Sequence, residues 1–381
     1  MKTLESEVVI IGGGIPGTAA AYFLAEAGKD VILLDKSEIG CEASGRNGGG
    51  VRQQGRDPAE LPFAMASVKI WETLEQRLGM DLEYRQWGNI YMAADEQSLE
   101  GLRETGERER ASGLPVEMVD HRQIEELTGV RVSGVIGGKY NPTDGHANPM
   151  LVTKAFGAAA VRAGARIFQN TPVTAMRAKN GEIEAVLTEE MEIRTRTAVL
   201  AAGPWSVDLA RTVDIEIPMK PIRSQLLVTE RVPKPFPQFL SLVDHGTYWR
   251  PTVSGNIHIG DASTLDTGRI TFDKRSSETI IEHMAKVTAR VFPDLAGVKV
   301  VRSWAGTNDG TPDMVAILGP CAKVKGLIIA TGYSGHGFCL GPISGKVISD
   351  LITRGESPLP LDQVRLERFP AGALVDSELA I

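Results

Sequence analysis

The stretch Val8-Val9-Ile10-Ile11-Gly12-Gly13-Gly14-Ile15-Pro16-Gly17 decides the fold of this chain. Four apolar residues that predict a short buried strand run directly into a glycine turn. A helix-forming stretch follows over residues 18–27, and a second apolar run, Val31-Ile32-Leu33-Leu34, is closed by Asp35. This order of strand, glycine turn, helix, strand and carboxylate is typical of the unit that binds an ADP-containing dinucleotide.

Each glycine of the turn has a physical task. Gly12 allows the tight turn, Gly14 lets the backbone approach a pyrophosphate, and Gly17 lets the helix lie close to the sheet. The helix N-terminus offers free N–H groups and the positive end of its dipole to the phosphates. Asp35 stands where a carboxylate can hydrogen-bond both ribose hydroxyls, which disfavours a 2′-phosphate. We therefore predict dinucleotide binding at this turn.

The composition indicates a folded enzyme. A length of 381 residues predicts about two domains, and 42% hydrophobic residues are enough for a sizeable core. The net charge of −7, without a long basic run, argues against nucleic acid or an anionic membrane as a partner. No apolar run has the length of a transmembrane segment. Because residues 1–7 lack the apolar core of a signal peptide, we expect a cytoplasmic protein.

Cysteine and histidine usage agrees with this expectation. Cys41, Cys321 and Cys339 are odd in number and lack C-x-x-C spacing, so a reducing cytoplasm fits and a disulfide framework does not. The six histidines include no H-x-H or H-x-x-x-H pair. We therefore predict no metal site.

A glycine-rich loop over residues 39–52 favours a flavin over a nicotinamide cofactor. It reads Ile-Gly-Cys-Glu-Ala-Ser-Gly-Arg-Asn-Gly-Gly-Gly-Val-Arg, which is unusual for a plain NAD-binding domain. Such a loop brings a second run of backbone close to a ligand, with Ser44 and Arg46 able to reach phosphate oxygens. The alternative interpretation is a flexible surface loop.

Two later strands also end in glycine. Residues 197–203 predict a strand that returns to the nucleotide sheet, after an Asn180-Gly181 hairpin in a small antiparallel layer. Residues 326–338 form another apolar strand that runs into glycines, and residues 342–352 have helical spacing. A helix N-terminus here can stabilise negative charge on a reduced isoalloxazine. A flavin dinucleotide is long enough to need both ends of the chain, which nicotinamide is not.

Five stretches make the sequence resemble a known family. They are the N-terminal fingerprint, residues 44–52, Leu200-Ala201-Ala202-Gly203, Trp304-Ala305-Gly306 with Thr311-Pro312-Asp313, and Ser334-Gly335-His336-Gly337-Phe338. Over essentially its whole length the chain resembles the FAD-dependent oxidoreductases of the D-amino-acid oxidase superfamily. Within it, the glycine oxidases, the sarcosine oxidases and the β subunits of sarcosine oxidase and L-proline dehydrogenase complexes are the most similar.

The resemblance implies an α/β fold, α+β overall, with two interleaved domains. A discontinuous Rossmann-like FAD-binding domain would comprise residues 1–80, 145–220 and 300–370. A substrate-binding domain, residues 81–144 and 221–299, would be built on an antiparallel sheet with helices. Within this second domain the sequence predicts strands and helices at the following places: strands over 82–92, 224–229, 247–251 and 257–260, and helices over 96–112 and 278–291.

The resemblance also implies a tightly and non-covalently bound FAD. Residues 44–50 would run along the pyrophosphate, Val173 would bond the adenine through its backbone, and residues 332–338 would line the pyrimidine side of the flavin. The cofactor-binding residues that it implies are Gly12, Gly14, Ile15, Pro16, Gly17, Asp35, Lys36, Ser44, Gly45, Arg46, Asn47, Gly48, Gly49, Gly50, Val173, Gly203, Trp205, Gly332, Tyr333, Ser334, Gly335, His336, Gly337 and Phe338.

Three positions depart from the family pattern. Asn308 stands where glycine oxidase has the arginine that clamps the substrate carboxylate, and Cys339 stands where monomeric sarcosine oxidase has a lysine. The flavin-bearing cysteine of that enzyme has no counterpart, since Cys321 lies in a different context. These departures argue against simple glycine or sarcosine oxidation. They favour a bulkier or differently anchored amine, such as proline, hydroxyproline or an N-substituted amino acid.

The predicted catalytic residues are Arg52, Tyr248 and His336. Arg52 and Arg250 are candidates for a carboxylate clamp, and for each the alternative is an ordinary surface or interdomain ion pair. Tyr248 matches an active-site tyrosine of glycine oxidase, and its alternative is a core aromatic on a strand. His336 belongs to the last family motif.

The resemblance implies oxidation of the C–N bond of a small amino acid or secondary amine. Hydride would pass to flavin N5, and the resulting imine would hydrolyse. The replacement at Cys339 favours a dehydrogenase with partner subunits over a self-sufficient oxidase that makes hydrogen peroxide. Two other classes stay open, namely a non-catalytic flavin-binding subunit and an NAD-dependent dehydrogenase that uses only the first motif.

Overall fold

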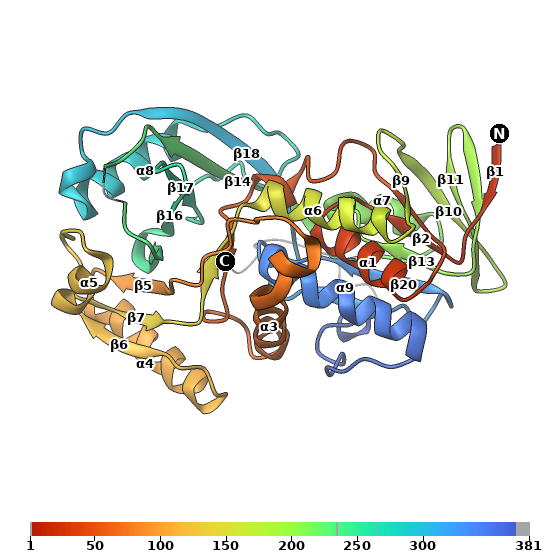
Figure 1. Cartoon of the computed structure of the whole chain (residues 1–381), viewed down its shortest axis with the longest axis horizontal. Coiled ribbons are helices and arrows are strands. Elements are labelled where there is room, and N and C mark those ends of the chain that lie inside the picture. The colour runs from red at the N-terminus through yellow and green to blue at the C-terminus, as the bar shows by residue number, and fades with distance from the viewer. Residues whose placement is uncertain (1, 234, 264, 371–381) are drawn as a thin grey trace.

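The computed structural model describes residues 2–233, 235–263 and 265–370, and its two largest sheets lie at opposite ends of an elongated molecule (Figure 1). The glycine turn and the segments that follow it build one end. A mixed sheet from later segments, covered by helices, builds the other end. The predicted class of fold, a Rossmann-like domain interleaved with a second domain built on an antiparallel sheet with helices, is confirmed, except that one pair of strands in the second sheet is parallel.

The nucleotide end is built on a six-stranded sheet in the order β19-β20-β13-β2-β3-β9. Its strands pair in parallel except for β19, which is antiparallel to β20. The two central strands β13 and β2 and the neighbouring β3 are buried throughout, as expected for a parallel sheet that is covered on both faces. The strands are β2 Val8–Ile11, β3 Val31–Leu34, β9 Arg166–Phe168, β13 Ala198–Leu200, β19 Ile317–Pro320 and β20 Leu327–Thr331.

Two helices that follow glycine turns pack against each other beside this sheet. Helix α1 (Ile15–Glu26) begins three residues before the predicted start, because Pro16 occupies its first turn, where a missing N–H has no cost. Helix α9 (Gly337–Arg354) begins five residues before its predicted start and includes Pro342. The two helices approach so closely that a Cβ on Gly345 would lie 2.5 Å from the carbonyl carbon of Ala19. Helices α3 Leu61–Leu78 and α6 Pro149–Arg162 pack beside them.

A four-stranded sheet in the order β1-β12-β11-β10 forms the predicted small layer. Asn180 and Gly181 connect β10 to β11, and both have positive φ angles, 53° and 76°. This is the geometry of the predicted two-residue hairpin turn, which is therefore confirmed. The strands are β1 Lys2–Glu5, β10 Val173–Lys179, β11 Glu182–Thr188 and β12 Met191–Arg194.

The other end of the molecule is an eight-stranded sheet in the order β18-β14-β17-β16-β15-β5-β7-β6. All neighbouring strands are antiparallel except β15 and β5, which are parallel. The chain crosses the nucleotide end between these two strands, and such a long crossover permits parallel pairing. The strands are β5 Asn89–Ala93, β6 Glu117–Asp120, β7 Gly137–Asn141, β14 Lys220–Thr229, β15 Phe239–Leu242, β16 Thr247–Pro251, β17 Ile257–Asp261 and β18 Val300–Gly310.

The strand predicted over 82–92 is only partly formed. Residues 89–93 form β5, whereas residues 82–88 contribute only an isolated bridge between Arg85 and His146. Positive φ angles at Glu83 and Gly88, 56° and 90°, interrupt the extended conformation. The other predicted strands of this domain, 224–229, 247–251 and 257–260, are confirmed within β14, β16 and β17.

Helices flank the eight-stranded sheet. The predicted helices are confirmed as α4 (Glu96–Ala111) and α8 (Glu278–Val291). The remaining elements are α2 Ala43–Arg46, α5 His121–Thr128, α7 Ser206–Arg211, the strands β4 Gly50–Val51 and β8 Gly145–His146, and the 3₁₀ turns Gly203–Trp205, Val243–His245, Pro293–Leu295 and Leu366–Arg368.

The predicted division into domains stays a prediction. Strand β18 starts at the predicted boundary, residue 300, and pairs with β14 along its whole length before the chain returns to the nucleotide end (Figure 1). Of the helices in the described residues, none is long and apolar enough to cross a membrane.

Candidate active site

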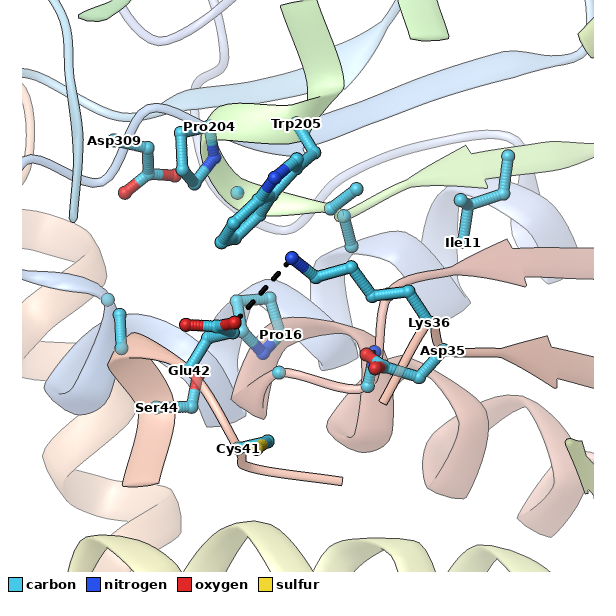
Figure 2. Close-up of a pocket in the computed structure, with 18 of the residues that line it drawn as sticks. Ile11, Pro16, Asp35, Lys36, Cys41, Glu42, Ser44, Pro204, Trp205 and Asp309 are labelled. Carbon is cyan, nitrogen blue, oxygen red and sulfur yellow. Dashed lines mark hydrogen bonds and ion pairs between the residues drawn. The ribbon is translucent and has the colours of Figure 1, made fainter. Parts of the chain in front are cut away.

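A pocket of about 430 Å³ lies at the carboxyl ends of β2, β3, β13 and β20 (Figure 2). Ligands of open parallel sheets bind at this edge. The lining includes many of the predicted cofactor residues, namely Gly12, Gly14, Ile15, Pro16, Asp35, Lys36, Ser44, Asn47, Val173, Gly203, Trp205, Tyr333, Gly335, Gly337 and Phe338. Segments from both ends of the chain therefore meet at one site, as the second strand–glycine–helix unit predicts.

Gly12 and Gly17 of the first turn cannot carry side chains without moving backbone. Gly12 has a φ of 114°, and a Cβ there would lie 2.2 Å from the Ala201 carbonyl oxygen. A Cβ on Gly17 would lie 2.0 Å from the Gly12 carbonyl oxygen. Gly14 differs, because its Cβ would project into the pocket lining, 3.0 Å from the Ser44 hydroxyl. The turn therefore has a concave surface that faces the pocket, and a side chain at residue 14 would fill it.

Asp35 holds the glycine turn from the next strand. Its Oδ2 accepts a hydrogen bond from the Gly13 N–H at 2.6 Å, and its Oδ1 accepts one from the Ser37 N–H at 2.7 Å. Burial raises the pKa of this carboxyl, and the two backbone N–H groups oppose the shift. The carboxylate lines the pocket beside the turn, where a ribose would lie if the pyrophosphate rests on the glycines.

The N-terminus of α1 points its free N–H groups at the pocket. Gly14 is the N-cap, and no side chain caps the helix locally. Instead the Ser44 hydroxyl, from the glycine-rich loop, accepts a hydrogen bond from the Ile15 N–H at 2.9 Å. The helix dipole and the first turn, which lies at the pocket, have the features of an anion site, and pyrophosphate binding there stays a prediction.

Lys36, Trp205 and Glu42 form an unpredicted cluster across the pocket (Figure 2). The Lys36 ammonium lies 3.1 Å from the centroid of the Trp205 ring and 3.5 Å from Glu42 Oε1. Lys274, from the segment before α8, approaches the same carboxylate at 2.6 Å. Burial lowers the pKa of Lys36, and the Glu42 charge opposes this shift. The cluster joins the nucleotide end to the eight-stranded sheet.

Residues 307–309 at the end of β18 line the pocket and were not predicted as ligands. Asp309 lies on the side of the pocket opposite Asp35, and its Oδ2 accepts a hydrogen bond from the Gly332 N–H at 2.7 Å (Figure 2). The Thr307 hydroxyl is buried, and no residue in the described part of the chain is its hydrogen-bond partner. These residues lie between the Trp304–Gly306 and Thr311–Asp313 motifs. Their position between two family motifs is the sequence feature that could have indicated them as pocket residues.

Some predicted cofactor residues lie outside the lining. Arg46 turns away from the pocket, because its Nε donates to the Cys41 carbonyl at 2.7 Å and its Nη1 donates to the Ala305 carbonyl at 3.0 Å. The phosphate contact expected of Arg46 is therefore not supported by its position. The others outside the lining are Gly17, Gly45, Gly48, Gly49, Gly50, Gly332, Ser334 and His336.

The loop glycines 48 and 49 lie against the eight-stranded sheet. A Cβ on Gly48 would lie 2.4 Å from the Tyr248 ring, and a Cβ on Gly49 would lie 3.0 Å from Arg250 Nε. Gly48 needs glycine because the Tyr248 side chain of β16 occupies the adjacent space, whereas Gly49 needs glycine because its φ is 77° and a Cβ would lie 2.3 Å from the Ala147 carbonyl oxygen. Close contact with a neighbouring sheet, which was not considered from the sequence, thus accounts for part of the glycine-rich loop.

Arg52 lies among aromatic rings beside this loop. Its guanidinium carbon is 5.5 Å from the centroid of the Tyr91 ring and 5.8 Å from that of Phe239, and its Nη1 contacts the Tyr91 hydroxyl. Phe239 in turn stacks on Tyr248 with centroids 5.4 Å apart. Burial lowers the pKa of Arg52 to about 10, and the nearby Arg56 charge adds to this, so Arg52 remains a cation at neutral pH. Arg52 and Tyr248 thus share one aromatic neighbour.

His336 faces Glu60 at the N-terminus of α3. Its Nδ1 lies 2.6 Å from Glu60 Oε2, and Glu60 Oε1 accepts a hydrogen bond from the Ala316 N–H at 2.9 Å. Burial lowers the pKa of His336, and the positive charge of Arg56 lowers it further. His336 is therefore neutral at neutral pH, with Nδ1–H donated to Glu60.

Arg250 lies close to two histidines, the buried His146 and the partly buried His258. Its Nη2 donates to His258 Nδ1 at 2.8 Å, and its Nε is buried without a hydrogen-bond partner among the residues that the structure describes. His146 Nε2 lies 3.0 Å from the Pro237 carbonyl oxygen. Burial lowers the pKa of His146 and of His258 to about 3, and the Arg250 charge adds to both shifts. Among the described residues neither Arg52 nor Arg250 forms an ion pair, so the alternative of an ordinary ion pair is not supported for either.

Stability is expected to fall with acid because these histidines stay neutral in the folded protein. Below pH 6.5 the unfolded chain takes up protons that the folded chain, with pKa values of about 3, does not. At pH 5 the loss is roughly 2 kcal/mol for each histidine. His146→Gln keeps a donor for the Pro237 carbonyl and removes one titration. Urea unfolding of the flavin-saturated protein between pH 7 and 5 should show a smaller decrease in the free energy of unfolding for this variant than for the wild-type protein. Equal decreases for the two proteins would contradict the assignment.

Comparison with known proteins agrees with the geometry of the pocket. The family described as FAD dependent oxidoreductase (DAO) matches residues 7–351. This chain belongs to that family. The pocket fits FAD, because it combines a glycine cradle, a helix N-terminus, a carboxylate beside the turn and the unpartnered Thr307 hydroxyl.

Individual relatives are similar over nearly the whole chain. An opine oxidase subunit from Agrobacterium tumefaciens is 30% identical, with 96% of this chain and 98% of that protein covered. Human mitochondrial dimethylglycine dehydrogenase is 27% identical over 96% of this chain, which spans only 44% of that longer protein. The structure of L-proline dehydrogenase from P. horikoshii superposes with a TM-score of 0.91 at 28% identity, covering 98% of this chain and all of that one.

Proposed function

We propose that this FAD-dependent oxidoreductase oxidises the C–N bond of a small amine that bears a carboxylate. FAD in the pocket would accept the hydride from the carbon next to nitrogen, and the resulting imine would hydrolyse to a carbonyl compound and an amine. Proline and dimethylglycine, named in the relatives, are both amines of this kind. The observation that carries the proposal is Arg52, a cation that forms no ion pair among the described residues, although the buried Asp144 raises its pKa, and that lies in an aromatic surrounding beside the glycine-rich loop.

In this proposal the glycine turn, the N-terminus of α1 and Ser44 hold the pyrophosphate. Asp35 and Val173 hold the adenosine, and the turn before α9 lies along the pyrimidine edge of the flavin. Asp309 acts through this turn, since its carboxylate fixes the Gly332 N–H. These assignments are supported by the lining of the pocket.

Arg52 is the proposed clamp for the substrate carboxylate. A carboxylate in a partly dry site needs a cation or several donors, and Asn308 supplies no charge. Asn308 Nδ2 is also engaged with the Ser224 hydroxyl at 2.7 Å. Arg250 is the weaker candidate, because it is only 2% exposed and one of its nitrogens is bonded to His258. Tyr248 supplies a neutral hydroxyl, since burial raises its pKa to about 12.

No described residue is placed as a strong general base in this proposal. His336 is neutral and held by Glu60, so we assign it to orienting the turn before α9 and the substrate next to it. An amine that binds as its free base passes hydride directly to the flavin, and the protein mainly orients it.

We propose that the electron acceptor is a partner subunit or another protein. One relative is named as a subunit, and Cys339 replaces the lysine of the oxidase. The purified single chain should therefore reoxidise slowly in air and form little hydrogen peroxide for each substrate turned over. Rapid turnover with stoichiometric peroxide would show a self-sufficient oxidase. The cytoplasmic location stays a prediction.

The reaction class is tested with a panel of amino acids and secondary amines. Each compound is mixed anaerobically with the purified protein while the absorbance of oxidised flavin is followed. We expect bleaching by one group of related carboxylated amines and the corresponding carbonyl product after hydrolysis. Bleaching only by alcohols or hydroxy acids, or by none of the amines, would refute the proposal.

A further inference from the structure

Arg56 lies directly beside the proposed clamp. Its Nε donates to the carbonyl oxygen of Arg52 at 3.3 Å, and the Cys339 thiol donates to the same oxygen, also at 3.3 Å. Arg56 and Cys339 come from distant parts of the sequence, yet they meet at one atom. No motif singled out Arg56, because nothing local indicates that its side chain reaches this place.

Arg56 forms no ion pair and no hydrogen bond with an acidic side chain within the described part of the chain, although its charge lowers the pKa of the buried Glu60 carboxyl. Arg56 is 9% exposed, and its Nη1 is buried without a hydrogen-bond partner among the described residues. The Glu60 carboxylate nearby is already bonded by His336 and by the Ala316 N–H. A buried cation whose donors are unmet is costly unless an anion arrives from outside. Two adjacent arginines, Arg52 and Arg56, therefore indicate an anion site.

We infer that Arg56 is the second cation of the substrate carboxylate site and that it holds one carboxylate together with Arg52. This inference rests on the proposed function and adds a residue to it. Cys339 cannot take this role, because burial raises the pKa of its thiol to about 11 and leaves it neutral. The site selects a small monocarboxylate in which the anion lies next to the amine.

The inference is tested with a carboxylate ligand that is not oxidised, so that binding is measured without turnover. We use 2-furoate, with furan as its neutral counterpart, and follow the perturbation of the flavin spectrum. Arg56→Met should weaken 2-furoate roughly 10- to 100-fold, since each charge-assisted bond contributes on this scale. Furan binding and FAD content should not change. Arg122→Met is the control, because Arg122 is 77% exposed and pairs only with Glu126 on its own helix.

A rescue experiment separates charge from structure. A lysine at position 339 would extend from the point where the Cys339 thiol meets the Arg52 carbonyl, next to the Arg56 side chain. In the Arg56→Met background, Cys339→Lys should therefore recover most of the 2-furoate affinity. Arg56→Lys alone should lose only a few-fold, because the charge stays. A Lys variant as weak as the Met variant, or a double variant without recovery, would overturn the inference.

The failure of this inference differs from the failure of the proposed function. If Arg52→Met weakens 2-furoate and Arg56→Met does not, only the role of Arg56 is wrong. If neither variant affects 2-furoate, the carboxylate site itself is misplaced. Loss of FAD from Arg56→Met with 2-furoate affinity normal in the flavin-containing fraction would assign Arg56 to the cofactor site and would also overturn the inference.

Discussion

Replacing Arg52 by methionine is expected to raise the KM for a carboxylated amine roughly 10²-fold, which corresponds to the loss of a charge-assisted pair of about 3 kcal/mol. Methionine keeps the contacts of the side chain with the Tyr91 and Phe239 rings and removes the charge. Because Arg52 lies outside the lining of the cofactor pocket, FAD content should stay normal. Steady-state kinetics with an artificial electron acceptor, together with the ratio of flavin to protein absorbance, measure both effects.

A matched control exists in Arg77, whose guanidinium carbon lies 5.5 Å from the Phe23 ring in a similar cation–ring contact far from the clamp. Arg77→Met should leave KM unchanged. If Arg52→Met keeps normal kinetics, or loses flavin before it loses affinity for substrate, Arg52 is a structural or cofactor residue. The clamp must then lie elsewhere, with Arg250 as the next candidate.

Replacing Gly14 by valine is expected to abolish FAD binding while the chain still folds. The N-cap conformation of Gly14, φ −71° and ψ 176°, is one that valine adopts without strain. Its Cβ would lie 3.0 Å from the Ser44 hydroxyl, which must shift slightly, and 3.8 Å from Pro16 Cδ, and it would occupy the path by which the pyrophosphate approaches the backbone. Acid treatment should release free FAD from the wild-type protein and none from the variant, while circular dichroism stays the same.

Substitutions at two further glycines serve as controls for this prediction. Gly17→Ala places a Cβ 2.0 Å from the Gly12 carbonyl oxygen, so it should damage the fold as well as flavin binding. Gly297→Val, where nothing lies within 4 Å of the added Cβ, should change neither. Normal FAD content in Gly14→Val would place the pyrophosphate away from this turn. Flavin that stays with the precipitated wild-type protein would contradict non-covalent binding.

Local signals were enough to predict the nucleotide end of the molecule. Gly17 meets the carbonyl oxygen of Gly12 in the same turn, and the Asn180-Gly181 turn needs only its own conformation. Gly12 meets Ala201, which is distant in sequence, but its positive φ is a local requirement of the turn. Helix α8 was predicted with the observed bounds because its apolar residues follow the helical period. The conformation of such elements is determined mainly by neighbouring residues, so the local sequence pattern is enough to predict it.

Contacts between distant segments were not predictable in the same way. Arg46 bonds two carbonyls, one of them at Ala305, and Arg56 meets Cys339, and neither pairing has a sequence pattern. Gly48 is glycine because a strand two hundred residues later places Tyr248 against it. The predicted strand does not form over residues 82–88, because two residues with positive φ angles interrupt the extended backbone despite the alternation of residue types. These are tertiary effects on local propensity.

The most direct test of the account compares one substrate from the amine panel with its analogue that lacks the carboxylate, for example L-proline with 2-methylpyrrolidine. Both are mixed anaerobically with the purified protein, and the rate and extent of flavin reduction are measured by stopped-flow absorbance. The account predicts rapid and saturable bleaching by the carboxylated amine and at least about 10²-fold lower efficiency for its analogue. Equal reduction by both compounds would contradict the claim that this flavoenzyme recognises its amine through a carboxylate.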